Sequence, residues 1–400
     1  MNHSFPTPPL AFLFGSGISI PAGIPSMSKI TNIILQGTGI RRHSIGTYEF
    51  GEPLYSHANI KDEYIPRVVS FLNRLKIEID VYYQSDRNHS TNYEDLYYLS
   101  SQIRDSELGE YDNPAVQPLI DKIMPDIKNM LVGGKEEIIK KWELNRLASE
   151  SCNYISDVVW RSLNKKPNKV EHLSFVKECI LKHDFQKVYI FTINHDTLLE
   201  QLFAQYGIEV IDGFGQPINN VRYWSLDLFD YETQKAHLYK LHGSINWFSF
   251  RSDAQDSDNE VIGLPLGPDI WHTKNPHGEL QRPIDGRPLF LAGTFNKMLY
   301  YTSGIYAGIY CRYLENLRSV GMLIICGYGF GDKGINNSII DWIYGEPGRK
   351  LYVIHPDSNR LQKSARGAIS KHWANWTNSG LLTVVEKKVE EVSWAEIRYK

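Results

Sequence analysis

Glycine and polar residues follow short apolar segments at five places, and these are the residues that could carry chemistry. The apolar segments are LAFLF at 10–14, VYIFT at 188–192, HLYKL at 237–241, MLIIC at 322–326 and LYVI at 351–354. Each has the length and composition of a buried strand in a parallel sheet. Because parallel strands place their carboxyl ends at one edge of the sheet, we expect the residues after them to line one nucleotide-sized crevice.

The first strand end carries the segment Gly15-Ser16-Gly17, and a helix is predicted to begin near residues 26–28. Glycine lets the backbone approach a phosphate closely, and a helix N-terminus supplies free N–H groups and partial positive charge. A tight turn explains the same residues equally well. The position of the third glycine in the usual dinucleotide fingerprint holds Ile20. Nucleotide binding and a simple turn therefore both remain open for this segment.

The second and third strand ends offer an amide, a carboxylate and an imidazole. Asn194 can both donate and accept hydrogen bonds, which suits a ligand contact. Asp196 either caps the helix that follows it or takes part in the site. His242 follows the third strand, and histidine titrates near neutral pH, as a general base requires. A lone histidine at a strand end is often structural, but convergence with the other strand ends favours a functional role.

The last two strand ends are a glycine-rich turn and a polar turn. Gly327-Tyr328-Gly329 follows MLIIC, with Asp332 and Asn336 close behind, and offers backbone N–H groups to a ligand. His355-Pro356-Asp357 follows LYVI, and here an ordinary turn is the favoured interpretation.

Alternating strands and helices predict a doubly wound, mostly parallel, Rossmann-like α/β sheet with a large helical insertion. The sheet domain is assigned to residues 1–36 and 186–400, and the insertion, with apolar residues at three- and four-residue spacing, to 37–185. The insertion could cover the site, form an oligomer interface or enlarge the core. Further predictions are strands at 209–212 and 288–292, helices at 300–319 and 335–343, a closing helix and LLTVV strand, and loops at 252–260 and 272–288.

Composition excludes several classes of protein. The net charge is −3 and no basic stripe is visible, so nucleic acid is not expected to bind directly. No segment has the roughly 18 consecutive apolar residues that span a bilayer, and the N-terminus lacks a signal peptide's basic region. The four cysteines lie far apart, which favours buried thiols in a reducing, cytoplasmic compartment.

Four of these segments, in this order, resemble motifs of the sirtuin family: GSGIS…AGIP at 15–25, TINHD at 192–196, LHGS at 241–244 and GYGF at 327–330. The resemblance covers residues 10–36 and about 186–357. It implies NAD binding, with Asn194, His242 and Asp196 as catalytic residues. The residues that it places at NAD are Gly15, Ser16, Gly17, Ser19, Ile24, Pro25, Thr192, Gly243, Ser244, Gly327, Tyr328, Gly329 and Asp357.

Departures from the family argue against protein deacetylation. Deacetylases of the family hold zinc with two Cys-x-x-Cys pairs, but this chain has no cysteine between Cys179 and Cys311, so no zinc is expected. The acidic-aromatic-basic run after GIP is replaced by Ser26-Met27-Ser28, and the glutamine before the catalytic asparagine by Ile193. The peptide-clamping strand is replaced by LFLAGTFNK.

The segments FTINHDTLLE and GYGFGDKGINN are more similar to bacterial sirtuin-like proteins of antiphage defence. That resemblance implies an NAD hydrolase that releases nicotinamide and ADP-ribose and depletes NAD in the infected cell. It also implies a homo-oligomer and a HerA-type ATPase partner. Two other functions remain open: a non-catalytic NAD or ADP-ribose sensor or scaffold subunit, and a nuclease subunit. The acidic segment SDAQDSDNE at 252–260 lacks the strand context of a metal nuclease site.

Overall fold

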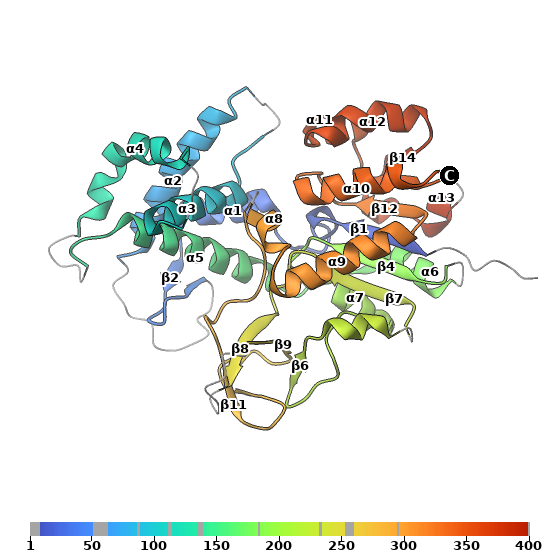
Figure 1. Ribbon diagram of the computed structural model, residues 1–400, viewed down its shortest axis with the longest axis horizontal. Coiled ribbons are helices and arrows are strands. Elements are labelled where there is room, and N and C mark those ends of the chain that lie inside the picture. The colour runs from blue at the N-terminus through green and yellow to red at the C-terminus, as the bar shows by residue number, and fades with distance from the viewer. Residues whose placement is uncertain are drawn as a thin grey trace, which may run out of the picture. The chain divides into compact units, whose positions relative to one another are not determined.

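The structure, a computed structural model, describes residues 9–50, 63–85, 89–110, 114–133, 139–182, 185–231, 234–252, 260–293 and 296–398. These residues form two compact units (Figure 1). Unit 1 comprises Met1–Ile24, Lys166–Leu291 and Met298–Lys400, and unit 2 comprises Pro25–Lys165 and Ala292–Lys297. The assignment of 37–185 as a separate helical domain stays a prediction.

A parallel sheet forms the centre of unit 1. Within the described residues it has seven strands in the order β14-β13-β12-β1-β4-β7-β5, and every neighbouring pair is parallel. After β1, the chain first adds β4 and β7 on one side of β1. It later adds β12, β13 and β14 on the other side. The switch point therefore lies between β1 and β12, where open α/β sheets bind ligands. The strands are β1 Leu10–Phe14, β4 Val188–Thr192, β5 Val210–Ile211, β7 Ala236–Lys240, β12 Met322–Cys326, β13 Lys350–Ile354 and β14 Leu382–Val385.

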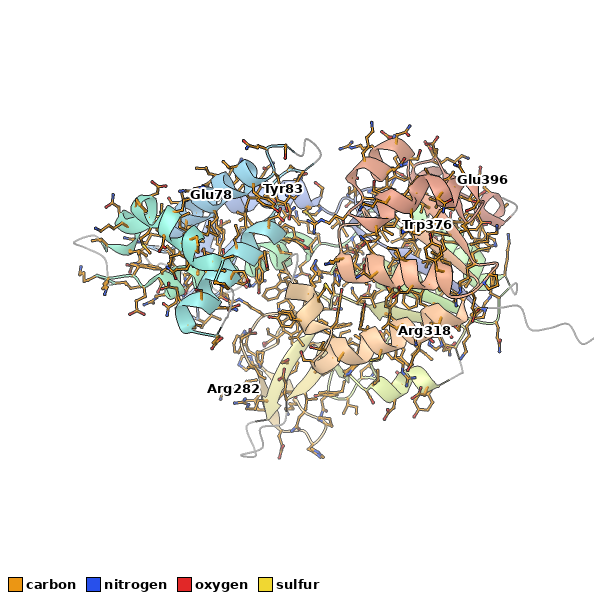
Figure 2. The ribbon with its side chains drawn as sticks, turned by 45° about the horizontal axis from the view of Figure 1, so that its top comes forward. Glu78, Tyr83, Arg282, Arg318, Trp376 and Glu396 are labelled. Atoms are coloured by element: carbon orange, nitrogen blue, oxygen red, sulfur yellow. The ribbon has the colours of Figure 1, made fainter. Side chains whose placement is uncertain are left out.

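Both faces of this sheet are covered because successive side chains of a strand point to opposite sides. Ala11 and Leu13 of β1 belong to a buried cluster with residues of α9, α10 and α12, including the fully buried Trp376 (Figure 2). Phe12 lies on the other face, with its ring 6.1 Å from Phe175 of α6 and 6.4 Å from Trp394 of α13. The helices of unit 1 are α6 Ser174–Leu181, α7 Leu198–Tyr206, α9 Gly304–Ser319, α10 Lys333–Gly345, α11 Ser358–Ser364, α12 Ala368–Asn378 and α13 Trp394–Arg398. Short 3₁₀ turns are η1 Ser16–Ile18, η3 Glu171–Leu173, η4 Leu226–Asp230 and η5 Val389–Glu391.

Unit 1 contains a second, antiparallel sheet, and the prediction of a loop at 272–288 was therefore wrong. Its strand order is β10-β11-β8-β9-β6 among the described residues. The predicted loop contains two of these strands, which are short and half polar and so lack an apolar signal. The strands are β6 Val221–Tyr223, β8 Phe248–Ser252, β9 Val261–Pro265, β10 Thr273–Lys274 and β11 Leu280–Pro283. Most of the predicted loop at 252–260 lies outside the described residues.

Two further predictions about unit 1 differ from the structure, the first throughout and the second only at its start, since α9 covers Gly304–Ser319. Residues 288–292 are not a strand: Phe290 makes only an isolated bridge with Gly243, and Leu291 N donates to the carbonyl of His242. The helix predicted at 300–319 is interrupted, because α8 (Asn296–Tyr300) ends before Tyr301 and α9 begins at Gly304, which has a φ of +55°. The predicted strand at 209–212 is present in part, as β5.

Unit 2 is mainly helical and packs around α5. Its elements are α1 Met27–Gln36, β2 Ile40–Arg42, β3 Tyr48–Phe50, α2 Ile65–Tyr82, α3 Tyr93–Leu108, α4 Val116–Ile127, η2 Lys128–Leu131 and α5 Leu144–Leu163. Helix α1 begins where predicted, because the Ser26 hydroxyl accepts a hydrogen bond from Lys29 N. From α5, the Tyr154 hydroxyl donates to Ile34 O at 2.9 Å and Asp157 accepts from Tyr48 N at 2.9 Å. The β2–β3 hairpin lies inside a region predicted as helical.

Cys152, Cys179 and Cys326 are buried and Cys311 is exposed. Burial raises the pKa of the Cys326 thiol to about 12. No helix among the described residues is long and apolar enough to cross a membrane.

Candidate functional site

The glycine segments after β1 and β12 lie in direct contact at the switch point. Gly17 N donates to Gly327 O at 2.9 Å, and Gly15 N donates to Cys326 O at 3.0 Å. A Cβ atom on Gly15 would lie 2.6 Å from Gly327 O, and one on Gly17 would lie 2.7 Å from Gly327 Cα. Only glycine fits these positions, because a Cβ at such distances would force the two turns apart.

The segment after Gly15 is a single 3₁₀ turn, Ser16–Ile18, and α1 begins only at Met27. Ile18 N and Ser19 N donate back to Gly15 O and Ser16 O. Helix α1 begins near residues 26–28 as predicted, so along the chain it does not follow the glycines directly. The hydroxyl of Ser16 is the exposed polar group of this turn. From η3, the buried His172 contacts Ile18 O through Nε2 at 2.8 Å and supports the turn, and burial lowers the pKa of His172.

Asn194 is buried after β4, with one of its two polar atoms fixed and the other unused. Its Nδ2 donates to Gly15 O at 3.1 Å and to Ser19 Oγ at 3.3 Å. Its Oδ1 accepts no hydrogen bond from the described residues, although Asn194 is only 6 % exposed. A buried acceptor without a partner costs about 1–3 kcal/mol. Oδ1 is therefore an atom that a ligand could satisfy.

The carboxylate of Asp196 contacts both the start of α7 and the turn after β1. Its Oδ1 accepts from Leu198 N, the first residue of α7, at 3.0 Å. Its Oδ2 accepts from Ser19 Oγ at 2.8 Å, and Ser19 in turn contacts Asn194. Thr192 Oγ1 donates to Phe14 O and accepts from Asn194 N, so it braces the same turn.

An ion pair between the buried Lys240 and the partly buried Glu200, which sequence reasoning missed, supports this turn. Lys240, the last residue of β7, donates from Nζ to Asp196 O and to Glu200 Oε1, the latter at 2.7 Å. Burial raises the pKa of Glu200, and the Lys240 ammonium opposes that shift. Lys240 could have been suspected because it is the only charged residue inside HLYKL.

His242 is 1 % exposed and contacts a phenol and a carboxylate from distant parts of the chain. Its Nε2 lies 2.6 Å from the Tyr301 hydroxyl and 3.2 Å from Asp332 Oδ2. The Tyr301 hydroxyl also lies 3.3 Å from Asp332 Oδ2. Tyr301 sits in the break between α8 and α9, and Asp332 caps α10. Sequence reasoning noted Asp332 but not Tyr301.

The turns after β4 and β7 are joined through His195. Ile245 N and Ser244 Oγ donate to His195 O at 3.0 and 3.3 Å. The rings of His195 and His242 lie 6.2 Å apart. Gly243 has a φ of +75°, and a Cβ there would lie 2.2 Å from Leu289 O, so this position requires glycine.

The turn after β12 is held by buried polar side chains. The Tyr328 hydroxyl donates to Asn336 Oδ1 at 2.8 Å and accepts from Asp332 N at 3.1 Å. Asn336 Nδ2 donates to Phe330 O at 2.8 Å, which stabilises Phe330 at a φ of +54°. Burial raises the pKa of Tyr328 well above its ordinary value, so its hydroxyl stays protonated. The Tyr328 side chain is therefore internal support for the turn.

The remaining predicted residues lie near or outside this cluster. Ile24 is buried and its N–H donates to Ser19 O at 3.2 Å. Asp357 is exposed and caps α11 by accepting from Arg360 N at 2.8 Å, as the turn interpretation expects. Pro25 belongs to unit 2.

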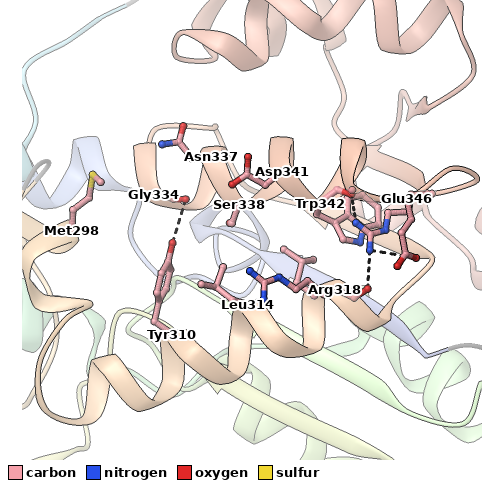
Figure 3. A pocket seen from close by; sticks show the side chains of 13 residues that line it. Met298, Tyr310, Leu314, Arg318, Gly334, Asn337, Ser338, Asp341, Trp342 and Glu346 are labelled. Atoms are coloured by element: carbon pink, nitrogen blue, oxygen red, sulfur yellow. Dashed lines mark hydrogen bonds and ion pairs between the residues drawn. The ribbon is translucent and has the colours of Figure 1, made fainter.

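Other features of the described residues lie apart from this cluster. A cavity of about 450 Å³ lies between α9 and α10, where Tyr310 and Leu314 face Ser338 and Asp341 (Figure 3). A second cavity of about 390 Å³ lies beside β5. None of the predicted site residues lines either cavity. Among the described side chains, no group of three or more His, Cys, Asp or Glu residues could hold a metal ion.

Comparison with known proteins finds one type of domain over part of the chain. Residues 188–377 match the family model described as SIR2-like domain. Similar solved structures include a Sir2 homologue in complex with NAD, at 14 % identity and a TM-score of 0.34, covering 98 % of this chain and 88 % of that one. Another is Sir2 bound to an acetylated peptide, at 11 % identity and a TM-score of 0.34, covering 96 % and 89 %. No curated protein matches the chain. The parallel sheet and the match over residues 188–377 together give this protein a sirtuin-like α/β fold.

Proposed function

We propose that this chain binds NAD and hydrolyses the bond between nicotinamide and ribose, releasing nicotinamide and ADP-ribose. The observation that carries the proposal is the buried Asn194, whose Oδ1 has no partner among the described residues while its Nδ2 is fixed by Gly15 O and Ser19 Oγ. A rigid, unsatisfied acceptor at the switch point of a sirtuin-like sheet suits a ribose hydroxyl or a water molecule.

The reaction needs a water placed at C1′ of the ribose and a base to take its proton. Asn194 Oδ1 orients the water or a ribose hydroxyl. His242 takes the proton, while the oxygen of water forms a bond to C1′. The C1′–N bond breaks and its electron pair leaves with nicotinamide, which departs as a neutral amide. Asp196 keeps Asn194 in place through Ser19.

We assign the binding residues to the same cluster of turns. The turns that contain Gly15, Ser16 and Gly17 lie beside the pyrophosphate, and those that contain Gly327–Gly329 and Asp357 lie beside the adenosine. We propose that no zinc takes part. We further propose antiphage defence by NAD depletion, a cytoplasmic homo-oligomer and a HerA-type ATPase partner. The similarity of FTINHDTLLE and GYGFGDKGINN to such proteins supports this role.

The test is a chromatographic assay of NAD incubated with the purified chain, alone and with a candidate ATPase. Loss of a general base typically costs about 10²–10⁴-fold, so His242→Ala should lower turnover on that scale. Asn194→Ala should lower it as well, with the fold retained. The matched controls are His277→Ala and Asn337→Ala, which change exposed residues and should leave turnover unchanged.

Product formation by wild type that persists in both site variants would contradict the assignment of these residues. ADP-ribose binding without any nicotinamide release, under either condition, would instead establish the non-catalytic binding subunit.

A further inference from the structure

A general base needs one free ring nitrogen near the water that it deprotonates, whereas the other ring nitrogen of His242 has two close polar neighbours. Its Nε2 lies against a phenol and a carboxylate from two other segments. We propose that Asp332, acting through Tyr301, is a positioning residue that keeps the proton of neutral His242 on Nε2 and so makes Nδ1 the basic nitrogen. This inference rests on the proposed function for its kinetic consequence only.

Proton accounting supports this arrangement. An ionised carboxylate only accepts hydrogen bonds, so the contacts of Asp332 with Nε2 and with Tyr301 both require the other group to donate. With neutral His242, one chain of donors agrees with these contacts: Nε2–H donates to the Tyr301 oxygen, and the Tyr301 O–H donates to Asp332 Oδ2. Nε2 remains 3.2 Å from the same carboxylate oxygen. The lone pair of the neutral imidazole then lies on Nδ1.

Both partners are rigid, as an orienting device requires. Asp332 Oδ1 accepts from Ile335 N at 3.0 Å as the N-cap of α10, where the helix dipole favours a negative charge. Its own N–H donates to Tyr328. The Tyr301 ring stacks on Tyr310 at a centroid distance of 4.2 Å and an interplanar angle of 4°. Burial and the Asp332 carboxylate raise the pKa of Tyr301 well above its ordinary value, so the phenol keeps its proton.

The titratable groups that face His242 come from three segments among the described residues. Asp332 is the N-cap of α10, Tyr301 lies in the break before α9, and His195 lies in the turn after β4. Asp332 is the only carboxylate of the three. Its charge stabilises the imidazolium that forms when His242 takes a proton, and low local dielectric strengthens this effect.

The variants are chosen to remove one interaction at a time. Asp332→Asn removes the charge and keeps a good N-cap, so the fold should persist. Tyr301→Phe removes the bridging hydroxyl but leaves the carboxylate 3.2 Å from Nε2, so its effect should be smaller. The controls are Asp341→Asn, an exposed carboxylate on α10, and Tyr310→Phe, the neighbouring phenol, which donates to Gly334 O.

The first readout is the His242 tautomer, from NMR of the full chain labelled with ¹⁵N-histidine. The His242 signals are those missing from His242→Gln. We expect the Nε2–H tautomer in wild type and in both controls, and a mixture of tautomers in Asp332→Asn. A wild-type Nδ1–H tautomer, or no change in Asp332→Asn, would overturn the proposal.

The second readout is the pH–rate profile of NAD hydrolysis. Asp332→Asn should lower kcat by roughly 10–100-fold with little change in KM, on the scale seen when a histidine at a metal site loses its carboxylate partner. Without the negative charge the imidazolium forms less readily, so the acid limb should move to lower pH. If Asp332 has a purely structural role, Asp332→Asn should lower the melting temperature and leave the acid limb at the same pH. That result would also overturn the proposal.

The two readouts separate this inference from the proposed function. If wild type hydrolyses no NAD, the proposed function fails, while the tautomer measurement still decides the role of Asp332. If hydrolysis occurs but neither the tautomer nor the acid limb responds to Asp332→Asn, the positioning role fails alone.

Discussion

At the scale of single residues, the site depends on Ser19, a buried hydroxyl that joins two loops. Its Oγ donates to Asp196 Oδ2 and accepts from Asn194 Nδ2. Its backbone carbonyl also accepts from Ala22 N and Ile24 N. One small side chain therefore fixes the carboxylate and the amide that the proposed reaction needs.

Ser19→Ala should destabilise the protein and loosen Asn194. It leaves the buried Asp196 Oδ2 without its donor, which costs about 1–3 kcal/mol. We expect the free energy of unfolding in denaturant to fall by about that amount and the Kd for ADP-ribose to rise. Ser303→Ala, at an exposed hydroxyl without a capping hydrogen bond, is the control. Unchanged stability and binding in Ser19→Ala would show that the Ser19 hydroxyl does not hold the site.

At the scale of elements, the site depends on how closely the turns after β1 and β12 approach. Gly17→Ala would place a Cβ 2.7 Å from Gly327 Cα, where only backbone movement can relieve the clash. Overpacking of this kind typically costs about 1–3 kcal/mol. We expect a lower melting temperature and weaker ADP-ribose binding, measured by calorimetry.

The control for this substitution lies in the turn after β12. A Cβ added at Gly331 would have no atom of the described residues within 4 Å, and Gly331 has no positive φ, so Gly331→Ala should melt and bind like wild type. If Gly17→Ala also behaves like wild type, close contact between the two turns is not what forms the site.

At the scale of the whole molecule, unit 1 contains Asn194, Asp196 and His242 within one sheet domain. ADP-ribose at about 100 times its Kd should therefore stabilise unit 1 by about 2.7 kcal/mol. Hydrogen exchange should slow in the segments that follow β1, β4, β7 and β12. Slowing confined to unit 2, or no slowing at saturating ligand, would contradict the location of the site.

The amino-acid sequence by itself determined the central strands of unit 1 and the residues at their ends. Strands buried on both faces must be continuously apolar, so LAFLF, VYIFT and MLIIC could be read directly as strands. The polar residues after them identified Asn194, Asp196 and His242 because parallel strands bring their ends to one edge. The antiparallel sheet left no such signal, since β10 and β11 are short and partly polar.

Only the tertiary structure decided which distant groups complete the site. Tyr301 follows His242 by 59 positions and lies in a break between two helices, within a segment whose apolar spacing indicated one continuous helix. Lys240 lies inside a strand, and its pairing with Glu200 depends on where α7 packs. Local sequence patterns indicate whether a segment is a helix or a strand, from the spacing of its apolar residues, and where a helix is capped. The partner of a buried polar group is set by packing between elements, and it follows only once those elements are placed.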